Sequence, residues 1–487
     1  MSYQIAPISH RRITIIPKNV YSLHQKNTNI TKVFWLWGVA ALLVTGGAAT
    51  SANPILTACA LVLLPLFVQL LWNPGEPPVI LFVCAIQWLQ ASLAIFHADY
   101  YGIRLRDFYG QDKIEFATYL SLIGVLVLAL GIWLSVGRFR STTNAATQAR
   151  RLSIKTVFFI YIIFSVAGYA LTAIAFSVPA LTQLCFGIAS LKWALVFCLF
   201  YCVLQQEKEY HFAAFVLTIE LLVGFLGFFA SFKTVFFVLF IAFASVANRY
   251  PLRRCLTSIG VMIIAAMLCA TWTAVKMEYR EFLNEGSGKQ EVTVDIKERI
   301  YKLSDLVFAV DTPHILNGFE QMLLRISYVS YFAETTEYVP KIAPYEHGAL
   351  WSAAIQHVLM PRILFPSKAE LDDSEVTVKY TGLAVAGKDQ GTSIGLGYMA
   401  ESYIDFGPVF MFLPIFMLGL VQGLIARICL RRAAYQLLGF CMSIAILLPL
   451  AESFAEAEAK ILGGLIYSLI LGGILFAFLK RILFPTS

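Results

Sequence analysis

The stretch EFATYLSLIGVLVLALGIWLSV at residues 115–136 decides the fold class. Only its first residue, Glu115, is charged. The run is long enough to cross the hydrocarbon core of a bilayer as one α-helix, which needs about 20 apolar residues. A helix satisfies its backbone hydrogen bonds internally, so it can cross a layer that contains no water. We therefore interpret 115–136 as a membrane span.

The rest of the sequence has the same character. Of its 487 residues, 59% are apolar and only 14% are charged, and the mean hydropathy is +0.72. Soluble domains contain about 25% charged residues, so this composition excludes a water-soluble globular protein. We predict an all-α integral membrane protein with about twelve transmembrane helices. The apolar runs lie at 33–50, 54–72, 78–96, 115–136, 156–177, 182–204, 211–230, 234–248, 256–275, 406–426, 434–451 and 461–479.

The positions of Lys and Arg predict the orientation of the bundle. Basic residues gather in the N-terminal segment and after the fourth, eighth, tenth and twelfth runs, which all fall on one side if the count is twelve. Short loops rich in Lys and Arg are cytoplasmic, so we predict that both termini are cytoplasmic. The predicted segments are a tail at 1–32, nine spans at 33–275, a large loop domain at 276–404, three spans at 405–479 and a tail at 480–487.

The segment at 276–404, which we call the long loop, falls on the opposite side and differs in charge. It contains 12 Lys and Arg and 18 Asp and Glu, a net charge of −6, whereas the rest of the chain has a net charge of +13. Its apolar periodicity predicts amphipathic helices at 293–310 and 313–333 and a third helix at 349–359. The polar, glycine-containing stretch at 367–391 is interpreted as a mobile surface flap.

Several motifs of the long loop resemble those of a known family. The clearest resemblance is to the Wzy-type polymerases of O-antigen and exopolysaccharide repeat units, bacterial membrane proteins related to the O-antigen ligases. It covers the long loop and its flanking spans. The motifs are KMEYR at 276–280, LRIS at 324–327, TTEYVP at 335–340, PYEHGAL at 344–350, MPRILFPSK at 360–368, TSIG at 392–395 and ESYIDFG at 401–407.

The resemblance implies a fold, a location and a reaction. It implies a bundle similar to the GT-C glycosyltransferases in the bacterial inner membrane, with a periplasmic long loop. The implied activity joins undecaprenyl-pyrophosphate-linked oligosaccharide repeat units into O-antigen, capsule or exopolysaccharide, with no cofactor. A chain-length regulator and a flippase are implied partners, and nucleic acid is not. The alternatives are an O-antigen ligase, another lipid-linked glycosyltransferase, and a twelve-span transporter or flippase.

This chemistry calls for cationic residues in the long loop. Arg makes bidentate, permanently charged contacts with phosphate oxygens, and such contacts can neutralise a departing pyrophosphate without a metal. Arg325 and Arg362 are catalytic candidates and Arg280 is a pyrophosphate-binding candidate, each beside apolar or aromatic residues. The alternative is that these arginines pair with carboxylates such as Glu278 or Glu320 on a solvated helix face.

Three further residues are candidates for pyrophosphate binding. Lys368 follows Arg362 by six residues, and Tyr345 lies in the PYEHGAL motif. Lys233 lies in a tight turn between the seventh and eighth runs. The alternative for Lys233 is that its side chain extends to the membrane interface and anchors two short spans.

A general base must accept the proton of the acceptor hydroxyl group. The candidates are Glu401, beside Tyr403 at the predicted membrane edge, and His347 in the PYEHGAL motif. The loop also contains His314 and His357. None of the three histidines has a partner at the spacing of zinc ligands, so we expect no metal site.

Charged residues within the predicted bundle suggest structural contacts. Lys192 and Glu220 fall at similar depth in the sixth and seventh runs, and an isolated charge there is costly. We predict that they form an ion pair that fixes this hairpin, which is favoured over a proton relay. Glu452, Glu456 and Glu458 follow the eleventh run and are interpreted as a solvated rim.

Overall fold

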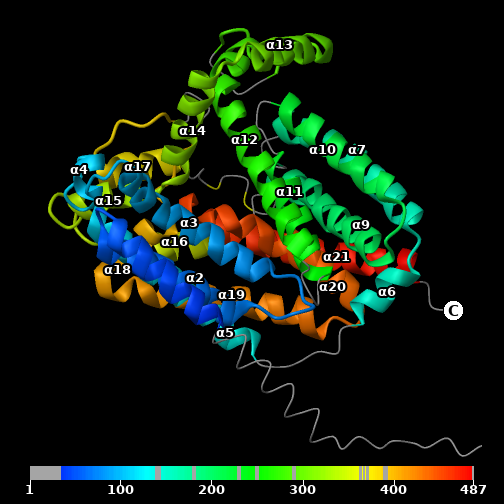
Figure 1. Cartoon of the computed structure of the whole chain (residues 1–487), viewed down its shortest axis with the longest axis horizontal. Helices are drawn as coiled ribbons and strands as arrows, with labels where there is room; N and C mark the ends of the chain where they lie inside the picture. Colours follow the sequence, from blue (N-terminus) through cyan, green and yellow to red (C-terminus); the bar gives the residue numbers. More distant parts are fainter. Residues whose placement is uncertain are drawn as a thin grey trace, which may run out of the picture.

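The computed structural model of the chain describes residues 35–137, 144–177, 182–227, 232–246, 252–287, 292–360, 365, 368, 372–387 and 393–484. Within these residues the chain is helical, and no strand occurs (Figure 1). The all-α prediction is therefore confirmed. The predicted tail at 1–32, residues 485–487 of the predicted tail at 480–487, and Arg362 lie outside the described residues.

The helices before the long loop form the larger part of the bundle. They are Trp35–Thr50, α2 (Pro54–Leu71), α3 (Val79–Tyr100), α4 (Leu105–Tyr109), α5 (Ile114–Val136), α6 (Ala145–Arg151), α7 (Ile154–Ser177), α8 (Thr182–Ser190), α9 (Lys192–Gln206), α10 (Tyr210–Leu226), α11 (Lys233–Val246) and α12 (Leu252–Leu283).

The long loop and the C-terminal part contain the remaining helices. The long loop contains α13 (Ile296–Ala309), α14 (Thr312–Ile326), α15 (Val329–Tyr338), α16 (Ala349–Leu359), α17 (Asp373–Thr381) and the start of α18 (Tyr398–Phe410). The helices that follow are α19 (Phe412–Arg427), the π-helical turn η3 (Ile428–Arg432), α20 (Gln436–Leu447), the 3-10 helix η4 (Leu448–Ala455) and α21 (Glu458–Leu483).

Nine helical segments of the described chain are long and apolar enough to cross a membrane. The chain therefore has the helices of a multi-pass membrane protein. The shorter apolar helices Trp35–Thr50, α10 and α11 coincide with three more of the predicted runs, and the fourth short one, α16, lies in the long loop. Among the nine, the segment of α20 and η4 is the most deeply buried, so it forms the centre of the bundle.

Small residues allow α5 and α19 to pack closely. A Cβ atom at Gly419 would lie 2.4 Å from the carbonyl oxygen of Leu128, and one at Gly423 would lie 2.5 Å from that of Ile132. Gly131 on α5 faces α19 in the same way, 2.5 Å from a backbone oxygen of that helix. Helices in membranes associate through such small-residue faces, where backbones approach directly.

The predicted intramembrane ion pair is present. Nζ of Lys192 lies 2.6 Å from Oε2 of Glu220, and the hydroxyl group of Tyr161 donates to Oε1 of Glu220 at 2.8 Å. The contact joins α9 and α10 to α7. The sequence did not predict that Lys192 begins a helix: the run at 182–204 is divided into α8 and α9, with Leu191 between them.

The long loop is more ordered than the sequence predicts. The predicted helices at 293–310 and 349–359 correspond to α13 and α16. The single helix predicted at 313–333 is wrong, because the backbone leaves helical geometry at Ser327 (φ −71°, ψ 74°) and divides it into α14 and α15. The flap interpretation is also wrong for α17, whose first turn is capped by the side chain of Asp372 and whose end is marked by Gly382 at φ 70°.

Candidate functional site

Three cationic side chains gather where α12 and α14 pack together. Lys276 and Arg280 lie one turn apart on α12, and Arg325 lies in the last turn of α14. The charge of Arg325 acts on both Lys276 and Arg280, so the three groups are close in space. We call Lys276, Arg280 and Arg325 the cationic cluster.

A glycine sets the distance between these two helices. A Cβ atom at Gly318 would lie 2.5 Å from the carbonyl oxygen of Ala270 and 2.9 Å from the Cβ atom of Ala274. A larger residue at this position would therefore push α14 away from α12. Arg325 follows Gly318 by about two helical turns, so this close contact also fixes where Arg325 meets the cations of α12.

The carboxylates that could neutralise these cations are engaged elsewhere. Oε1 of Glu278 accepts a hydrogen bond from Nζ of Lys302 at 2.7 Å. Glu320 lies 2.6 Å from Nε2 of His97 and accepts a hydrogen bond from the hydroxyl group of Tyr101 at 2.6 Å. The bond from Tyr101 also lowers the pKa of Glu320, which keeps this carboxylate ionised where it is.

Lys276 and Arg325 therefore carry positive charge that Glu278 and Glu320 do not cancel. In the described part of the chain, neither Lys276 nor Arg325 forms an ion pair, and the side chain of Arg325 is exposed. Like charges held together by helix packing bind anions, and guanidinium groups favour phosphate. The alternative that Arg325 pairs with Glu320 is not what the structure has, because His97 and Tyr101 bind that carboxylate.

Tyr328 lies between the cationic cluster and a group of buried acids. Its hydroxyl group donates to the carbonyl oxygen of Gly395. Burial raises the pKa of Tyr328, Asp373 and Glu401 raise it further, and Arg325 opposes them. Tyr328 is therefore within reach of charges of both signs, and it connects α15 to the segment that leads into α18.

Glu401 is buried at the start of α18. Its side chain and backbone together are 6% exposed, and Oε2 accepts a hydrogen bond from the backbone N–H of Glu458 at 2.7 Å. Burial raises the pKa of Glu401 to about 7, and the neighbouring carboxylates add to this effect. As a general base it would contact substrate only after α18 or α21 moves. The solvated-rim interpretation of Glu458 is wrong, because this residue is 1% exposed.

Two of the motif segments pack against each other. Asp405, in the ESYIDFG motif, accepts hydrogen bonds from the backbone N–H groups of Leu350 and Trp351 at 3.0 and 2.8 Å, so it caps the first turn of α16. The ring of Tyr345 lies 5.9 Å from that of Tyr403. His347 is exposed and has a positive φ of 51°, so the PYEHGAL motif presents His347 outward while Tyr345 packs inward.

The other predicted lysines have protein partners. Nζ of Lys233 lies 2.7 Å from Oε2 of Glu452, which joins the start of α11 to η4. Nζ of Lys368 donates to the carbonyl oxygen of His357, near the end of α16. Neither contact involves the cationic cluster. Arg362 lies outside the described residues.

Comparison with known proteins gives a family. One protein-family model, described as a domain of unknown function (DUF8712), matches residues 112–483. The chain belongs to the DUF8712 family. No curated protein and no solved structure matches it. The region matched to DUF8712 includes the cationic cluster, Glu401 and the motif segments of the long loop.

In this DUF8712 protein the sequence prediction of the site omitted Lys276. The signal was present, because Lys276 and Arg280 are four residues apart in the motif KMEYR and share one face of a helix. Their convergence with Arg325 could not be deduced from the sequence. It depends on the close contact between α12 and α14 at Gly318.

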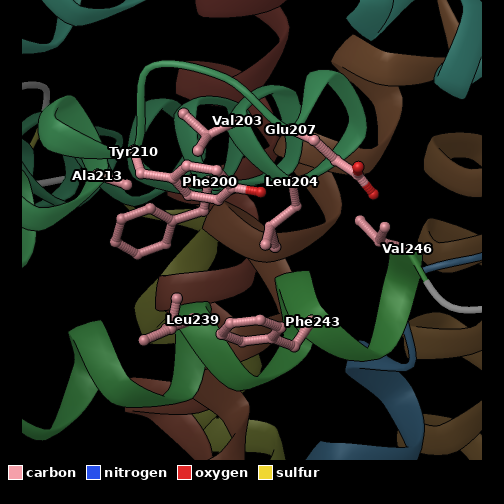
Figure 2. Close-up of a pocket in the computed structure, with 9 residues that line it drawn as sticks. All are labelled: Phe200, Val203, Leu204, Glu207, Tyr210, Ala213, Leu239, Phe243 and Val246. Atoms are coloured by element: carbon pink, nitrogen blue, oxygen red, sulfur yellow. The ribbon is translucent and has the colours of Figure 1, made fainter. Parts of the chain in front are cut away.

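A pocket of this DUF8712 protein lies elsewhere, between α9, α10 and α11 (Figure 2). Its volume is about 240 Å³, and apolar side chains dominate its lining. Figure 2 shows the carboxylate of Glu207 near Val246 at one end of the pocket. None of the predicted site residues lines it. Across the described segments, no group of three or more His, Cys, Asp or Glu side chains is placed to hold a metal ion.

Proposed function

We propose that the protein is a membrane glycosyltransferase that polymerises undecaprenyl-pyrophosphate-linked oligosaccharide repeat units. The observation that carries this proposal is the cationic cluster at Lys276, Arg280 and Arg325, which lies within the long loop and in which Lys276 and Arg325 form no ion pair among the described residues. Two of the motifs that resemble those of Wzy-type polymerases, KMEYR and LRIS, contain these three residues. Together they favour a site for a pyrophosphate leaving group.

The proposed topology has twelve spans and two cytoplasmic termini in the bacterial inner membrane. The nine long segments and the three shorter apolar helices Trp35–Thr50, α10 and α11 supply the spans. The long loop is then periplasmic, and the end of α12 that carries the cationic cluster faces the same side. The bundle would be of the GT-C-like kind that the resemblance implies.

The proposed reaction needs no nucleotide, because the donor already carries its leaving group. A hydroxyl oxygen of the acceptor repeat unit attacks the anomeric carbon of the donor glycan. The bond from that carbon to the pyrophosphate oxygen breaks, and the pyrophosphate lipid leaves with the electron pair. The cationic cluster stabilises the negative charge that develops on the leaving group. The hydroxyl proton passes to a general base, for which Glu401 and His347 are the candidates.

The experiment uses the full chain reconstituted in liposomes with lipid-linked repeat units, and measures glycan chain length over time. We expect Lys276→Ala, Arg280→Ala and Arg325→Ala each to lower the rate by about 100-fold, the usual effect of removing one group that stabilises the transition state. The matched control is Lys341→Ala, which removes an exposed cation of the long loop that pairs with Glu337, and it should polymerise at the wild-type rate. Long chains formed equally fast by the three cluster variants would disprove the proposal.

Two alternatives have distinct outcomes in the same assay. An O-antigen ligase uses the same leaving group, and it would transfer finished glycan to a lipid core while forming no longer chains. A transporter would move repeat units across the bilayer without changing their length. The intramembrane pair of Lys192 and Glu220 is the observation that favours a transporter, and its role is tested separately below.

A further inference from the structure

Two buried carboxyl groups meet where α18 and α21 begin. Glu401 is 6% exposed and Glu458 is 1% exposed. The backbone N–H of Glu458 donates to Oε2 of Glu401 at 2.7 Å, so the first turn of α21 is capped by a side chain from α18. The charge of Glu401 also acts on the carboxyl group of Glu458. The two acids are therefore neighbours in a site that excludes solvent.

The hydrogen bonds of Glu458 do not satisfy an ionised carboxylate. Oε1 accepts a hydrogen bond from the hydroxyl group of Ser402 at 3.1 Å, and that hydroxyl group in turn accepts one from Nε1 of Trp351 at 3.1 Å. Oε2 of Glu458 is buried and has no hydrogen-bond partner among the described atoms. A buried charged oxygen without a partner is costly, whereas a protonated carboxyl group carries no charge and gains a donor.

The surroundings of the pair do not supply the missing positive charge. Asp373 from α17 and Asp405 from α18 act on Glu401 with the same sign of charge, and Tyr328 faces it from α15. Lys460 is the cation that acts on Glu401, but its Nζ forms an ion pair with Asp373. Two ionised carboxylates at this position would therefore repel each other without compensation.

We propose that Glu401 and Glu458 form a proton-binding site in which one of the two buried carboxyl groups stays protonated, and that this proton keeps the starts of α18 and α21 together. Loss of this proton leaves two buried like charges at one junction, which loosens it. The segment before α18 also packs closely at this junction, because a Cβ atom at Gly395 would lie 3.3 Å from the carbonyl oxygen of Ala455. The inference does not depend on the proposed glycan chemistry.

The site is connected to the cationic cluster. The hydroxyl group of Tyr328 donates to the carbonyl oxygen of Gly395, and Tyr328 follows Arg325 by three residues. A change in the packing of α18 against α21 therefore reaches Arg325 through one hydrogen bond and one turn of chain. The proton-binding site is therefore a pH-sensitive element connected to Arg325, one of the residues that we assign to anion binding.

The first test measures the thermal unfolding midpoint, Tm, of the purified full chain between pH 5 and pH 8.5. A carboxyl group whose proton is held more tightly in the folded state makes stability fall as pH rises towards its folded pKa, and stability is flat above that pKa. We expect the wild-type Tm to fall as the pH rises through this range. Glu401→Gln/Glu458→Gln should lose most of this fall, because the amides cannot ionise.

The matched control is Glu278→Gln, which removes an exposed carboxylate of the same chain and should keep the wild-type profile. If the double variant retains the wild-type fall, or if the wild-type Tm does not change over this range, the proton-binding site is refuted. A second measurement uses the wild type alone, so it does not depend on whether the variants fold. Infrared spectra of the wild type at pH 6 should show the C=O band of a protonated carboxyl group that disappears at pH 8.5, and absence of this band would also overturn the proposal.

Discussion

Breaking the ion pair between Lys192 and Glu220 should destabilise the bundle strongly, whereas removing both charges should not. The two groups are 2.6 Å apart, with side chains that are 15% and 3% exposed. At an effective dielectric constant of 20, the attraction at this distance is about 6 kcal/mol, and the desolvation of the two ions offsets much of it. The single variant Glu220→Gln leaves the Lys192 cation buried without a counter-charge.

The expected magnitudes follow from this balance. Glu220→Gln and Lys192→Met should each lower the free energy of unfolding by about 3–5 kcal/mol, the usual cost of an uncompensated buried charge. The double variant Lys192→Met/Glu220→Gln should cost less than either single variant. Its amide oxygen can still accept the hydrogen bond of Tyr161, whose hydroxyl group lies 2.8 Å from the carboxylate in the wild type, so the Tyr161 hydroxyl group keeps its acceptor and no charge is left unpaired.

The assay is a double-mutant cycle on the purified protein, unfolded in mixed detergent micelles. The coupling energy between the two sites should exceed about 2 kcal/mol, as expected for residues in direct contact. Single variants that cost less than about 1 kcal/mol, or a double variant whose cost equals the sum of both, would refute the structural role. Polymerisation of repeat units by a folded double variant would further separate this role from ion or proton transport, which requires the charges.

Three other predictions concern stability. Gly423→Ala should lower the free energy of unfolding by about 1–3 kcal/mol, measured by thermal unfolding, because its Cβ atom would lie 2.5 Å from the backbone oxygen of Ile132. The control is Gly473→Ala, which should be neutral or stabilising because a Cβ atom there has nothing within 4 Å. Asp99→Asn should lower the free energy of unfolding by about 2–3 kcal/mol in the same assay. The reason is that this carboxylate accepts hydrogen bonds from the side chains of three residues near the start of α2. Hydrogen bonds from the neighbouring α17 side chains lower the pKa of Glu346. Its contribution to stability is therefore present above the ordinary glutamate pKa and is lost as the pH falls. Glu346→Gln should flatten the Tm profile below about pH 5, and an unchanged profile would contradict this reasoning.

The sequence predicts the bundle well because membrane spans are local features. Hydropathy located the helices, and equal distances from a bend were enough to pair Lys192 with Glu220. Breaks in the helices were harder to predict, because they depend on tertiary packing. Nothing in the amphipathic pattern at 313–333 indicates that the chain turns at Ser327, and the helix at Asp373–Thr381 lies in a stretch whose polarity favours a loop.

The candidate site could be predicted only in part, for a related reason. From the sequence, Arg325 could contact substrate or form a surface pair with a carboxylate such as Glu320. The structure excludes the pair with Glu320, because Tyr101 and His97 already bind that carboxylate, and the substrate contact stays a prediction. For Glu458 the prediction was wrong. An acidic residue next to a turn is predicted to be solvated, but this one is buried by α18, which begins 60 residues earlier in the sequence.

The length of α12 has a consequence for how the protein could respond to its membrane. Its 32 residues correspond to about 48 Å of helix, and the hydrocarbon core is about 30 Å thick. Figure 1 shows α12 extending past its neighbours to carry α13 at its far end. The excess length is taken up by tilt or by projection, and in both cases bilayer thickness sets the height of Arg280 above the lipid. A thicker membrane would therefore bring the cations of α12 closer to the headgroups, and a thinner one would move them away from the lipid.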